Sequence, residues 1–280
     1  MATYDPITMA LFFLFSLCVG SFIGLFVYRF PRILEKHEES DGHLLPMLFS
    51  RQADNASLAY PRSHCDYCGT PIPILENMPL LSFVLLKGKC SNCKESISRL
   101  YPIIELVTGL SGLGILMKFG FSYEAAPFFL LLCILITLTF IDLNNKILPD
   151  QLTLSLLWLG LVTNLVFNFT PLVDAVLGSI LGYLALWGVF WAYKFFTDKE
   201  ALGFGDFKLL AAMGAWFGVY ALSWIIFIAA LSGLIFAMSQ ISLRRRSFKD
   251  PIAFGPFISL AAVIYLFFQK EIMQSISFHI

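Results

Sequence analysis

The sequence predicts an all-α protein that crosses a membrane about eight times and carries one soluble loop between its first two membrane helices. Of the 280 residues, 58% are hydrophobic and only 14% are charged, which is more apolar surface than a soluble core could hide. Long uncharged runs recur along the chain, and about 20 apolar residues suffice to cross a bilayer. Lysine and arginine gather in alternate connecting segments, as they do in membrane proteins.

The expected spans can be taken in order along the chain. The run 102–117 contains a single charge, Glu105, whose carboxylate we expect to face protein rather than lipid. The run 209–243 is too long for one crossing, and a break near 218–223 makes the first of its two helices short. Five further uncharged runs each fit one span: 7–28, 125–141, 151–173, 175–193 and 251–269. The total is eight.

The first run could be a cleaved signal peptide, but no Lys or Arg precedes it, whereas Arg29 and Arg32 follow it, which favours an anchor. With the N-terminus outside, the segments left on the inner side hold 17 of the 19 Lys and Arg residues, as the positive-inside rule requires. Those segments are 29–100, 142–150, 194–208 and 244–250. Both termini are therefore expected on the outer side. The formal net charge is zero and gives no reason to expect a nucleic-acid partner.

This reading divides the chain into a first transmembrane helix (1–28), a cytosolic loop (29–100) and a seven-helix membrane core (101–280). The stretch 35–55 within the loop is charged and has no periodicity, so we expect it to be flexible. Two Cys-x-x-Cys pairs lie 21 residues apart in the same loop: Cys65, Cys68, Cys90 and Cys93. This spacing suits tetrahedral Zn²⁺.

Disulfides or simple buried thiols are the alternatives for these cysteines, but disulfides rarely persist in a reducing cytosol. Four thiolates fill the coordination shell of zinc and leave no position for water, so the metal is expected to be structural rather than catalytic. Gly69 follows the first pair where the backbone must turn tightly, and Lys94 takes that place in the second pair.

Acidic residues at span boundaries are candidates for chemistry because charge is costly inside a bilayer. Asp142 follows the third span and Asp206 precedes the short sixth one, so the topology places both on the inner face, although they are 64 residues apart. Two neighbouring carboxylates share a proton, one activating water and the other protonating the leaving group, which is aspartyl protease chemistry. Gly203 and Gly205 would let an extended substrate approach, and Lys208 could tune the pair.

An aspartate at the start of a helix is often only a cap. Asp150 follows Pro149 and precedes a span, so we interpret it mainly as a cap. Asp142 lies at the C-terminal end of a helix, where the macrodipole disfavours negative charge, so capping does not explain it. For Asp206 both interpretations stay open.

Seven ordered segments of the chain resemble the bacterial type IV prepilin peptidases, a family of GxGD-type intramembrane aspartyl proteases. The segments are GSFIGLFVYRFP from Gly20, PRSHCDYCG from Pro61, ENMPLLSFVLLKGKCSNC from Glu76, RLYPIIELVTG from Arg99, IDLNNKILPDQLTL from Ile141, ALGFGDFKLLAAMGAW from Ala201 and AFGPFISLA from Ala253. In that family the catalytic aspartates fall at the positions of Asp142 and Asp206.

The resemblance implies an enzyme of the bacterial inner membrane that cleaves the basic leader of prepilins or pseudopilins on the cytosolic side. The outer side, where the charge distribution puts both termini, is then the periplasm. It also implies N-methylation of the new N-terminus with S-adenosylmethionine. For this second activity Glu76, Asn77, Gly88 and Lys89 are candidates, with ordinary loop structure as the alternative. Many relatives have asparagine at the position of Gly24, a departure that bears on the methyltransferase rather than the peptidase.

Two other classes of function are compatible with intramembrane carboxylates. A transporter would use them to carry protons or ions, but it expects ionisable groups near the midplane and does not explain the cysteines. A membrane scaffold could dock a cytosolic partner on its zinc loop, in which case the aspartates would be replaceable.

Overall fold

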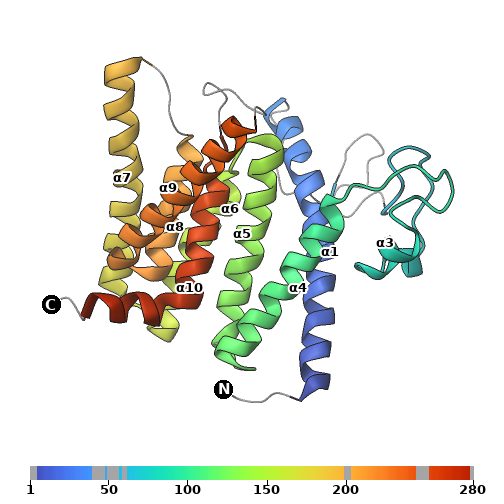
Figure 1. The fold of residues 1–280 in the computed structure, drawn as a ribbon, viewed down its shortest axis with the longest axis horizontal. Coiled ribbons are helices and arrows are strands. Elements are labelled where there is room, and N and C mark those ends of the chain that lie inside the picture. Colours follow the sequence, from blue (N-terminus) through green and yellow to red (C-terminus); the bar gives the residue numbers. More distant parts are fainter. Residues whose placement is uncertain are drawn as a thin grey trace. The chain divides into compact units, whose positions relative to one another are not determined.

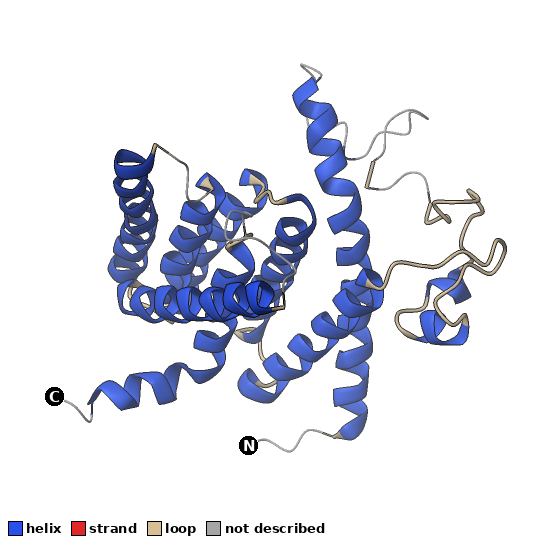
Figure 2. Ribbon diagram, turned by 45° about the horizontal axis from the view of Figure 1, so that its top comes forward, coloured by secondary structure: helices blue, strands red, loops and turns tan. Residues whose placement is uncertain are grey.

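The computed structural model describes residues 5–39, 48, 57–58, 62–198, 203–243 and 252–277. Within these residues the chain is helical and has no strand, only two isolated β-bridges in the loop, which confirms the all-α prediction. The chain divides into two compact units, Met1–Thr137 and Leu138–Ile280, which Figures 1 and 2 draw as ribbons. The segment 244–250 and most of the stretch 35–55 lie outside the described residues.

Among its described residues, the first unit contains four helices and the start of a fifth. They are α1 (Pro6–Glu39), the short 3₁₀ helix η1 (Ile74–Asn77), α3 (Leu81–Leu85), α4 (Leu100–Phe119) and the first part of α5 (Ala125–Asn145). Helix α1 continues well beyond residue 28, where the sequence analysis ends the span. The run of apolar residues ends there because Arg29 and Arg32 are charged, while the helix itself continues through Pro31.

Helices α1 and α4 pack closely because small residues line their contact. A Cβ atom on Gly20 would lie 2.8 Å from the Cα of Glu105, and one on Gly112 would overlap the side chain of Ser16. Close approach through small residues is typical of membrane helices. Glu105 is only 7% exposed, and its carboxylate accepts a hydrogen bond from the backbone N–H of Leu80 at 2.8 Å. The expectation that Glu105 faces protein is confirmed.

The second unit contains the rest of α5 and five more helices: α6 (Asp150–Phe167), α7 (Leu172–Thr197), α8 (Phe204–Phe217), α9 (Val219–Ser242) and α10 (Gly255–Ser277). Seven helices among the described residues are long and apolar enough to span a membrane. The eighth, α8, is the short helix that the sequence predicts, since its 14 residues extend only about 21 Å. Gly218, with a φ of 79°, separates α8 from α9, within the break expected at 218–223.

Helix α8 is the most deeply buried element, because every residue from Asp206 to Phe217 except Lys208 is buried. Its backbone meets α7 at Gly178, where an added Cβ would lie 2.6 Å from the carbonyl oxygen of Gly214. On its other side, the Asn164 amide of α6 donates to the carbonyls of Ala215 and Trp216 at 2.8 and 3.1 Å. Packing from two helices thus fixes α8 and the aspartate in its first turn.

Candidate active site and metal centre

Asp142 lies in the last turn of α5 and is only 5% exposed. Its Oδ2 atom accepts a hydrogen bond from the backbone N–H of Gly255 at 3.1 Å, and Gly255 is the first residue of α10. The first N–H groups of a helix lack partners within the helix and carry the positive end of its dipole. The start of α10 therefore compensates for the unfavourable position of Asp142 at the end of α5.

Asp206 lies in the first turn of α8 and is 6% exposed. Its Oδ2 accepts the N–H of Gly203 at 3.3 Å, and its own N–H donates to the carbonyl of Gly203 at 3.1 Å. Asp206 is thus a helix cap, one of the two interpretations left open by the sequence. Its Oδ1 atom, however, is buried and has no hydrogen-bond partner among the described residues. Leaving such an oxygen unsatisfied costs free energy. Capping therefore explains the position of Oδ2 but not the burial of Oδ1.

The two aspartates belong to the same unit, and the carboxylates are close enough to interact electrostatically. Each has one oxygen held by the N–H of a glycine, from Gly255 and from Gly203. Leu148 lies against the backbone near both carboxylates, because it occupies the space beside Gly205 and beside Gly255 where a Cβ would otherwise project. The structure thus brings the predicted pair together.

Gly203 and Gly205 have different surroundings. A Cβ on Gly205 would lie 2.6 Å from the Cβ of Leu148, whereas one on Gly203 would meet only the carboxylate of Asp206, at 3.6 Å. Gly205 is therefore required for packing within the protein, which is a different reason from the substrate approach expected from the sequence. The backbone at Gly203 is exposed and remains open for such an approach.

The structure corrects two expectations about neighbouring residues. Lys208 forms an ion pair with Asp150 instead of with the aspartate pair. Asp150 does not cap α6, because the N-cap residue is Pro149 and no side chain caps this helix. The ion pair between Lys208 and Asp150 is accessible to solvent, with 55% of the Asp150 side chain exposed, so its contribution to stability is small. It joins the starts of α6 and α8.

The four cysteines of the loop come together, with their Sγ atoms all within 4.8 Å of one another. The Sγ atoms of Cys65 and Cys93 are 3.7 Å apart, and those of Cys68 and Cys90 are 3.9 Å apart. Four sulfurs at about 2.3 Å from a tetrahedral zinc ion would be separated by about 3.8 Å. The cluster could therefore hold a metal ion of this kind.

Each cysteine pair sits on the same kind of tight turn. The N–H of Gly69 donates to the carbonyl of Cys65, and the N–H of Lys94 donates to that of Cys90. Gly69 and Lys94 both have positive φ, 68° and 61°, so the tight turn expected after each pair is confirmed. Hydrogen bonding with Thr70 lowers the pKa of Cys68 to about 6, which favours the metal-binding thiolate at this position, whereas burial and the neighbouring cysteine side chains raise the pKa of Cys93 to about 12.

The cysteine loop contacts the end of the first membrane helix. The hydroxyl of Tyr28 on α1 donates to the carboxylate of Asp66, which lies between Cys65 and Cys68, at 3.3 Å. The guanidinium of Arg32 stacks on the Tyr28 ring at 3.9 Å from its centroid. A metal that orders the cysteine turns would therefore also order the contact between loop and helix.

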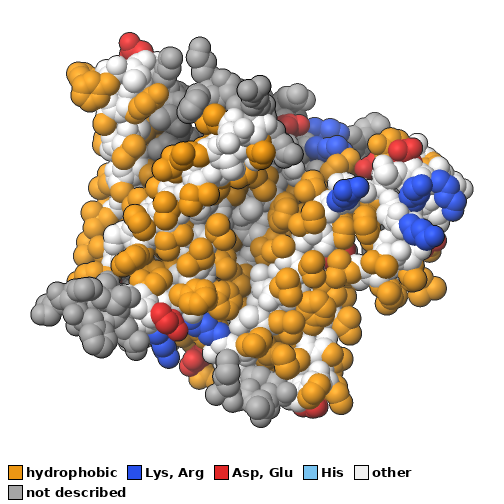
Figure 3. Space-filling model, in the orientation of Figure 1, with side chains coloured by type: hydrophobic (Ala, Val, Ile, Leu, Met, Phe, Trp, Pro, Cys, Tyr) orange, Lys and Arg blue, Asp and Glu red, His pale blue; other side chains and the backbone are white. Residues whose placement is uncertain are grey.

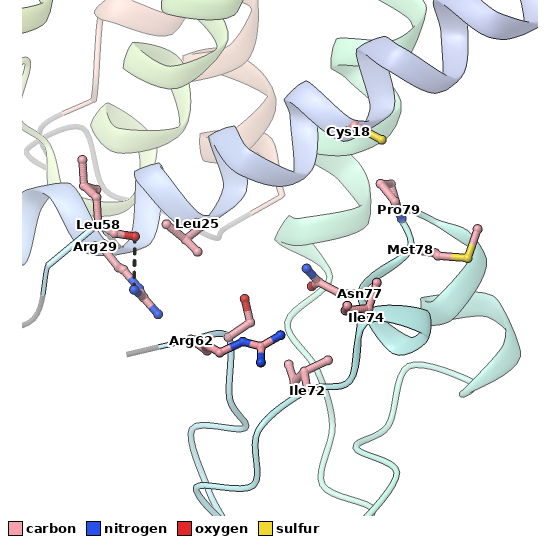
Figure 4. A pocket seen from close by; sticks show the side chains of 11 residues that line it. Cys18, Leu25, Arg29, Leu58, Arg62, Ile72, Ile74, Asn77, Met78 and Pro79 are labelled. Atoms are coloured by element: carbon pink, nitrogen blue, oxygen red, sulfur yellow. Dashed lines mark hydrogen bonds between the residues drawn. The ribbon is translucent and has the colours of Figure 1, made fainter. Parts of the chain in front are cut away.

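A pocket of about 430 Å³ opens between α1 and the loop. Arg29 lies on its α1 side and donates to the carbonyl of Ser57, while Arg62 and Asn77 project from the loop (Figure 4). Cys18 and Ser63 also line it, and the rest of the wall is apolar: Leu25, Leu58, Ile72, Ile74, Met78 and Pro79. The volume and the mixture of apolar walls with a few polar groups suit a small ligand.

Of the four methyltransferase candidates, Asn77 alone is among the pocket-lining residues. Gly88 has a φ of 69°, and a Cβ there would meet the Phe83 ring at 2.9 Å, so the turn after α3 explains this glycine. Lys89 is exposed and its backbone pairs with Ser96. Arg29 and Arg62 were not singled out by the sequence analysis, because their nearness to Asn77 depends on the fold.

Comparison with known proteins identifies two consecutive family models. Residues 14–119 match the bacterial peptidase A24 N-terminal domain, and residues 129–238 match the type IV leader peptidase family. Curated proteins named prepilin leader peptidase/N-methyltransferase are similar over nearly their whole length. The one from Aeromonas salmonicida is 43% identical, covering 95% of this chain and 92% of the relative. The one from Pseudomonas aeruginosa is 39% identical, covering 94% and 91%. No solved structure matches significantly.

Proposed function

We propose that Asp142 and Asp206 are the catalytic pair of this chain. The chain belongs to the type IV leader peptidase family and is an enzyme that cleaves prepilin leaders and N-methylates the product. The observation that carries the proposal is the pair of buried carboxylates, from α5 and α8, each held at one oxygen by a glycine N–H. The Oδ1 atom of Asp206, which lacks a partner among the described residues, is available for water or substrate.

In the proposed mechanism the two carboxylates share one proton. The ionised carboxylate takes a proton from a water molecule as the water oxygen bonds to the scissile carbonyl carbon. The protonated one donates to the leaving nitrogen as the carbon–nitrogen bond breaks. The N–H groups of Gly203 and Gly255 keep both side chains in place while the charge moves between them.

We place this reaction at the cytosolic face of the bacterial inner membrane, with both termini in the periplasm. The support is the distribution of positive charge, since 17 of the 19 Lys and Arg residues lie in segments assigned to the inner side. The substrate is a prepilin or pseudopilin whose leader lies in the cytosol and whose apolar stem lies in the membrane lipid. No contact with nucleic acid is part of this proposal.

We propose that the four-cysteine cluster binds Zn²⁺ as a structural ion. The sulfur separations support this assignment, and four thiolates complete the tetrahedral shell of zinc without an open position. The ion would hold the two turns together and would leave hydrolysis to the aspartates.

We further propose that S-adenosylmethionine binds in the pocket between α1 and the loop. This donor supplies an electrophilic methyl group for the new terminal amine. Arg62 would bind its carboxylate, Asn77 would bind a polar edge, and the apolar wall would cover the adenine ring. Arg29 would hold the loop backbone in place through the carbonyls of Ser57 and Leu58.

One assay tests the enzymatic assignment. The purified protein is incubated with a prepilin-like substrate, with and without S-adenosylmethionine, and the products are weighed by mass spectrometry. We expect a loss equal to the leader in both reactions and a gain of one methyl group only with the donor. Transport activity without any change in substrate mass would favour the transporter class instead.

Variants test the methyl-donor pocket separately. Arg62→Ala and Asn77→Ala should raise the donor concentration needed for methylation of a pre-cleaved substrate and leave leader cleavage unchanged. Lys89→Ala is the matched control, because Lys89 is exposed and lies outside the pocket lining. Equal effects of the three changes on methylation would contradict the proposal that S-adenosylmethionine binds in this pocket.

A further inference from the structure

The loop between α1 and α4 contains a segment whose surface is unusual for a soluble loop. From Pro71 to Leu86 the only charged residue is Glu76. Six large apolar side chains of this segment are 44–79% exposed: Ile74, Leu75, Met78, Leu81, Val84 and Leu85. Contiguous exposed apolar surface of this kind marks a site of contact with another surface or with a membrane.

The contact with α4 shows how deep this segment lies. The N–H of Leu80 is bonded to the buried carboxylate of Glu105, which is five residues beyond Leu100, where the helix begins. At 1.5 Å per residue, that is about 7 Å along the helix from its start. Helix α4 has 20 residues, about 30 Å, and so nearly all of it is needed to cross the hydrocarbon core. Leu80 therefore lies beside the first turns of α4, within the cytosolic end of this span.

Helix α1 gives a second and larger measure of the depth of this segment. Glu105 packs against Gly20, which precedes Arg29, the first charged residue after the apolar run, by nine positions, or about 13 Å. Met78 and Pro79 line one pocket together with Cys18, which lies still deeper in the span. Both helices place the middle of the segment at the level of the hydrocarbon.

The two ends of the segment lie on the same side, because the cysteine cluster brings them together. Cys68 precedes the segment and Cys90 follows it, and their sulfurs are 3.9 Å apart. The chain turns back after α3 through Lys87 and Gly88, both of which have positive φ. The segment therefore enters and leaves through one face.

The spans of the same unit also carry exposed apolar side chains. Ile103 and Leu110 of α4 are exposed in the same unit, and Figure 3 shows apolar side chains covering the lower part of the lobe that contains α3. Lys and Arg side chains gather on the upper and outer parts of that lobe. Lys87 and Lys89 follow α3 directly, and lysines at such positions extend toward the headgroups.

We propose that residues 74–85 form a re-entrant hairpin embedded in the membrane, with α3 in contact with lipid. The cysteine cluster at the membrane surface holds the two ends of the hairpin together. The surface that the hairpin contacts is the bilayer itself, on the same side as the cysteine loop. Glu105 satisfies the backbone N–H of Leu80 at a depth where water does not. This inference rests on the membrane location of the chain and not on the assignment of the aspartates.

Photocrosslinking in lipid vesicles tests the hairpin. The photoreactive residue p-benzoylphenylalanine replaces Val84 in the full-length protein, which is reconstituted in phosphatidylethanolamine and phosphatidylglycerol, irradiated and weighed. Tyr67 is the matched control, since it is 73% exposed against 69% for Val84 but lies on the metal loop. Phe227, 59% exposed in the middle of α9, is the positive control.

We expect phospholipid adducts at position 84 in a yield similar to that at 227, and only background at 67. Retained metal content and leader cleavage would show that each variant is folded, and Leu75 on η1 provides a second position if the change at 84 prevents folding. Absence of lipid adducts at both 84 and 75, or crosslinks to a second copy of the chain instead of lipid, would overturn the proposal. A variant that still forms lipid adducts but no longer cleaves the leader would support the hairpin and would count only against the assignment of the active site.

Discussion

At the scale of single residues, the main finding is that backbone N–H groups of two glycines hold the two aspartates. The topology of the sequence is enough to place Asp142 and Asp206 on one face, and helix-end electrostatics distinguish Asp142 from Asp150. The role of Gly255 could not be derived in this way, because it lies 113 residues from Asp142 and its N–H carries no signal in the sequence. Only the resemblance of the segment from Ala253 to the family indicates that the residues around Gly255 matter for the site.

Gly255→Ala tests this arrangement. The added Cβ would lie 2.6 Å from the Oδ2 of Asp142 and would displace the carboxylate, so we expect leader cleavage to slow by about a hundredfold, the typical effect of a misplacement of about 1 Å. Gly233→Ala is the control, because its Cβ would meet nothing closer than 3.5 Å. Initial rates of cleavage give the comparison, and equal rates for the two variants would show that Asp142 need not be held by this N–H.

The shared proton predicts a bell-shaped dependence of cleavage on pH. Activity should fall at low pH, where both carboxyls are protonated, and at high pH, where both are ionised. The two limbs belong to the pair rather than to either residue. The measurement is kcat/KM for leader cleavage across the pH range in which the protein stays folded. A profile that rises to a plateau without a second limb would mean that only one ionisation controls the reaction.

At the scale of elements, the position of Asp206 depends on the contact of α8 with α7. The carbonyl of Gly178 lies where a Cβ on Gly214 would project, so Gly214→Ala forces the two backbones apart. We expect it to lower the stability of the protein by about 2 kcal/mol, as overpacking typically does, and to reduce cleavage.

Thermal unfolding and the cleavage rate of Gly214→Ala are compared with those of Gly188→Ala. Gly188 belongs to α7 but has nothing within 4 Å of the added Cβ, and alanine is the better helix former. The control should therefore be as stable as the unsubstituted protein. The account of α8 fails if both variants retain full stability and activity.

The cysteine cluster makes a second prediction at this scale. Because few buried apolar side chains support the two cysteine turns, removal of the metal with a chelator should expose residues 62–70 and 87–98 to protease, as should Cys65→Ser or Cys90→Ser. Mass spectrometry of limited-digestion fragments locates the cuts, and measured zinc content accompanies each sample. Unchanged zinc content in the cysteine variants, or full protection without metal, would contradict a structural zinc site.

The sequence predicts the membrane helices well and the loop only in part. Hydrophobic length alone locates α5, α6 and α7, and the break between α8 and α9 follows from a run too long for one span. The apolar segment 71–86 is too short to be recognised as a span, so its sequence predicts part of a cytosolic loop. Its depth depends on the Leu80 to Glu105 hydrogen bond, which joins residues 25 positions apart and cannot be read from periodicity.

At the scale of the whole molecule, two compact units correspond approximately to two family models. The cysteine cluster and the pocket belong to Met1–Thr137, and the aspartate pair belongs to Leu138–Ile280. The models match 14–119 and 129–238. This division supports the view that methylation depends on the first unit and hydrolysis on the second, so that a change at one site should spare the other activity.

The most direct test of the central claim is the activity of Asp142→Asn and Asp206→Asn in the product-mass assay. Each should reduce leader cleavage by at least about a thousandfold, because asparagine can neither accept nor hold the shared proton. Both should still methylate a pre-cleaved substrate, and Asp150→Asn should keep both activities. Full leader cleavage by either Asp142→Asn or Asp206→Asn would contradict the assignment of the catalytic pair.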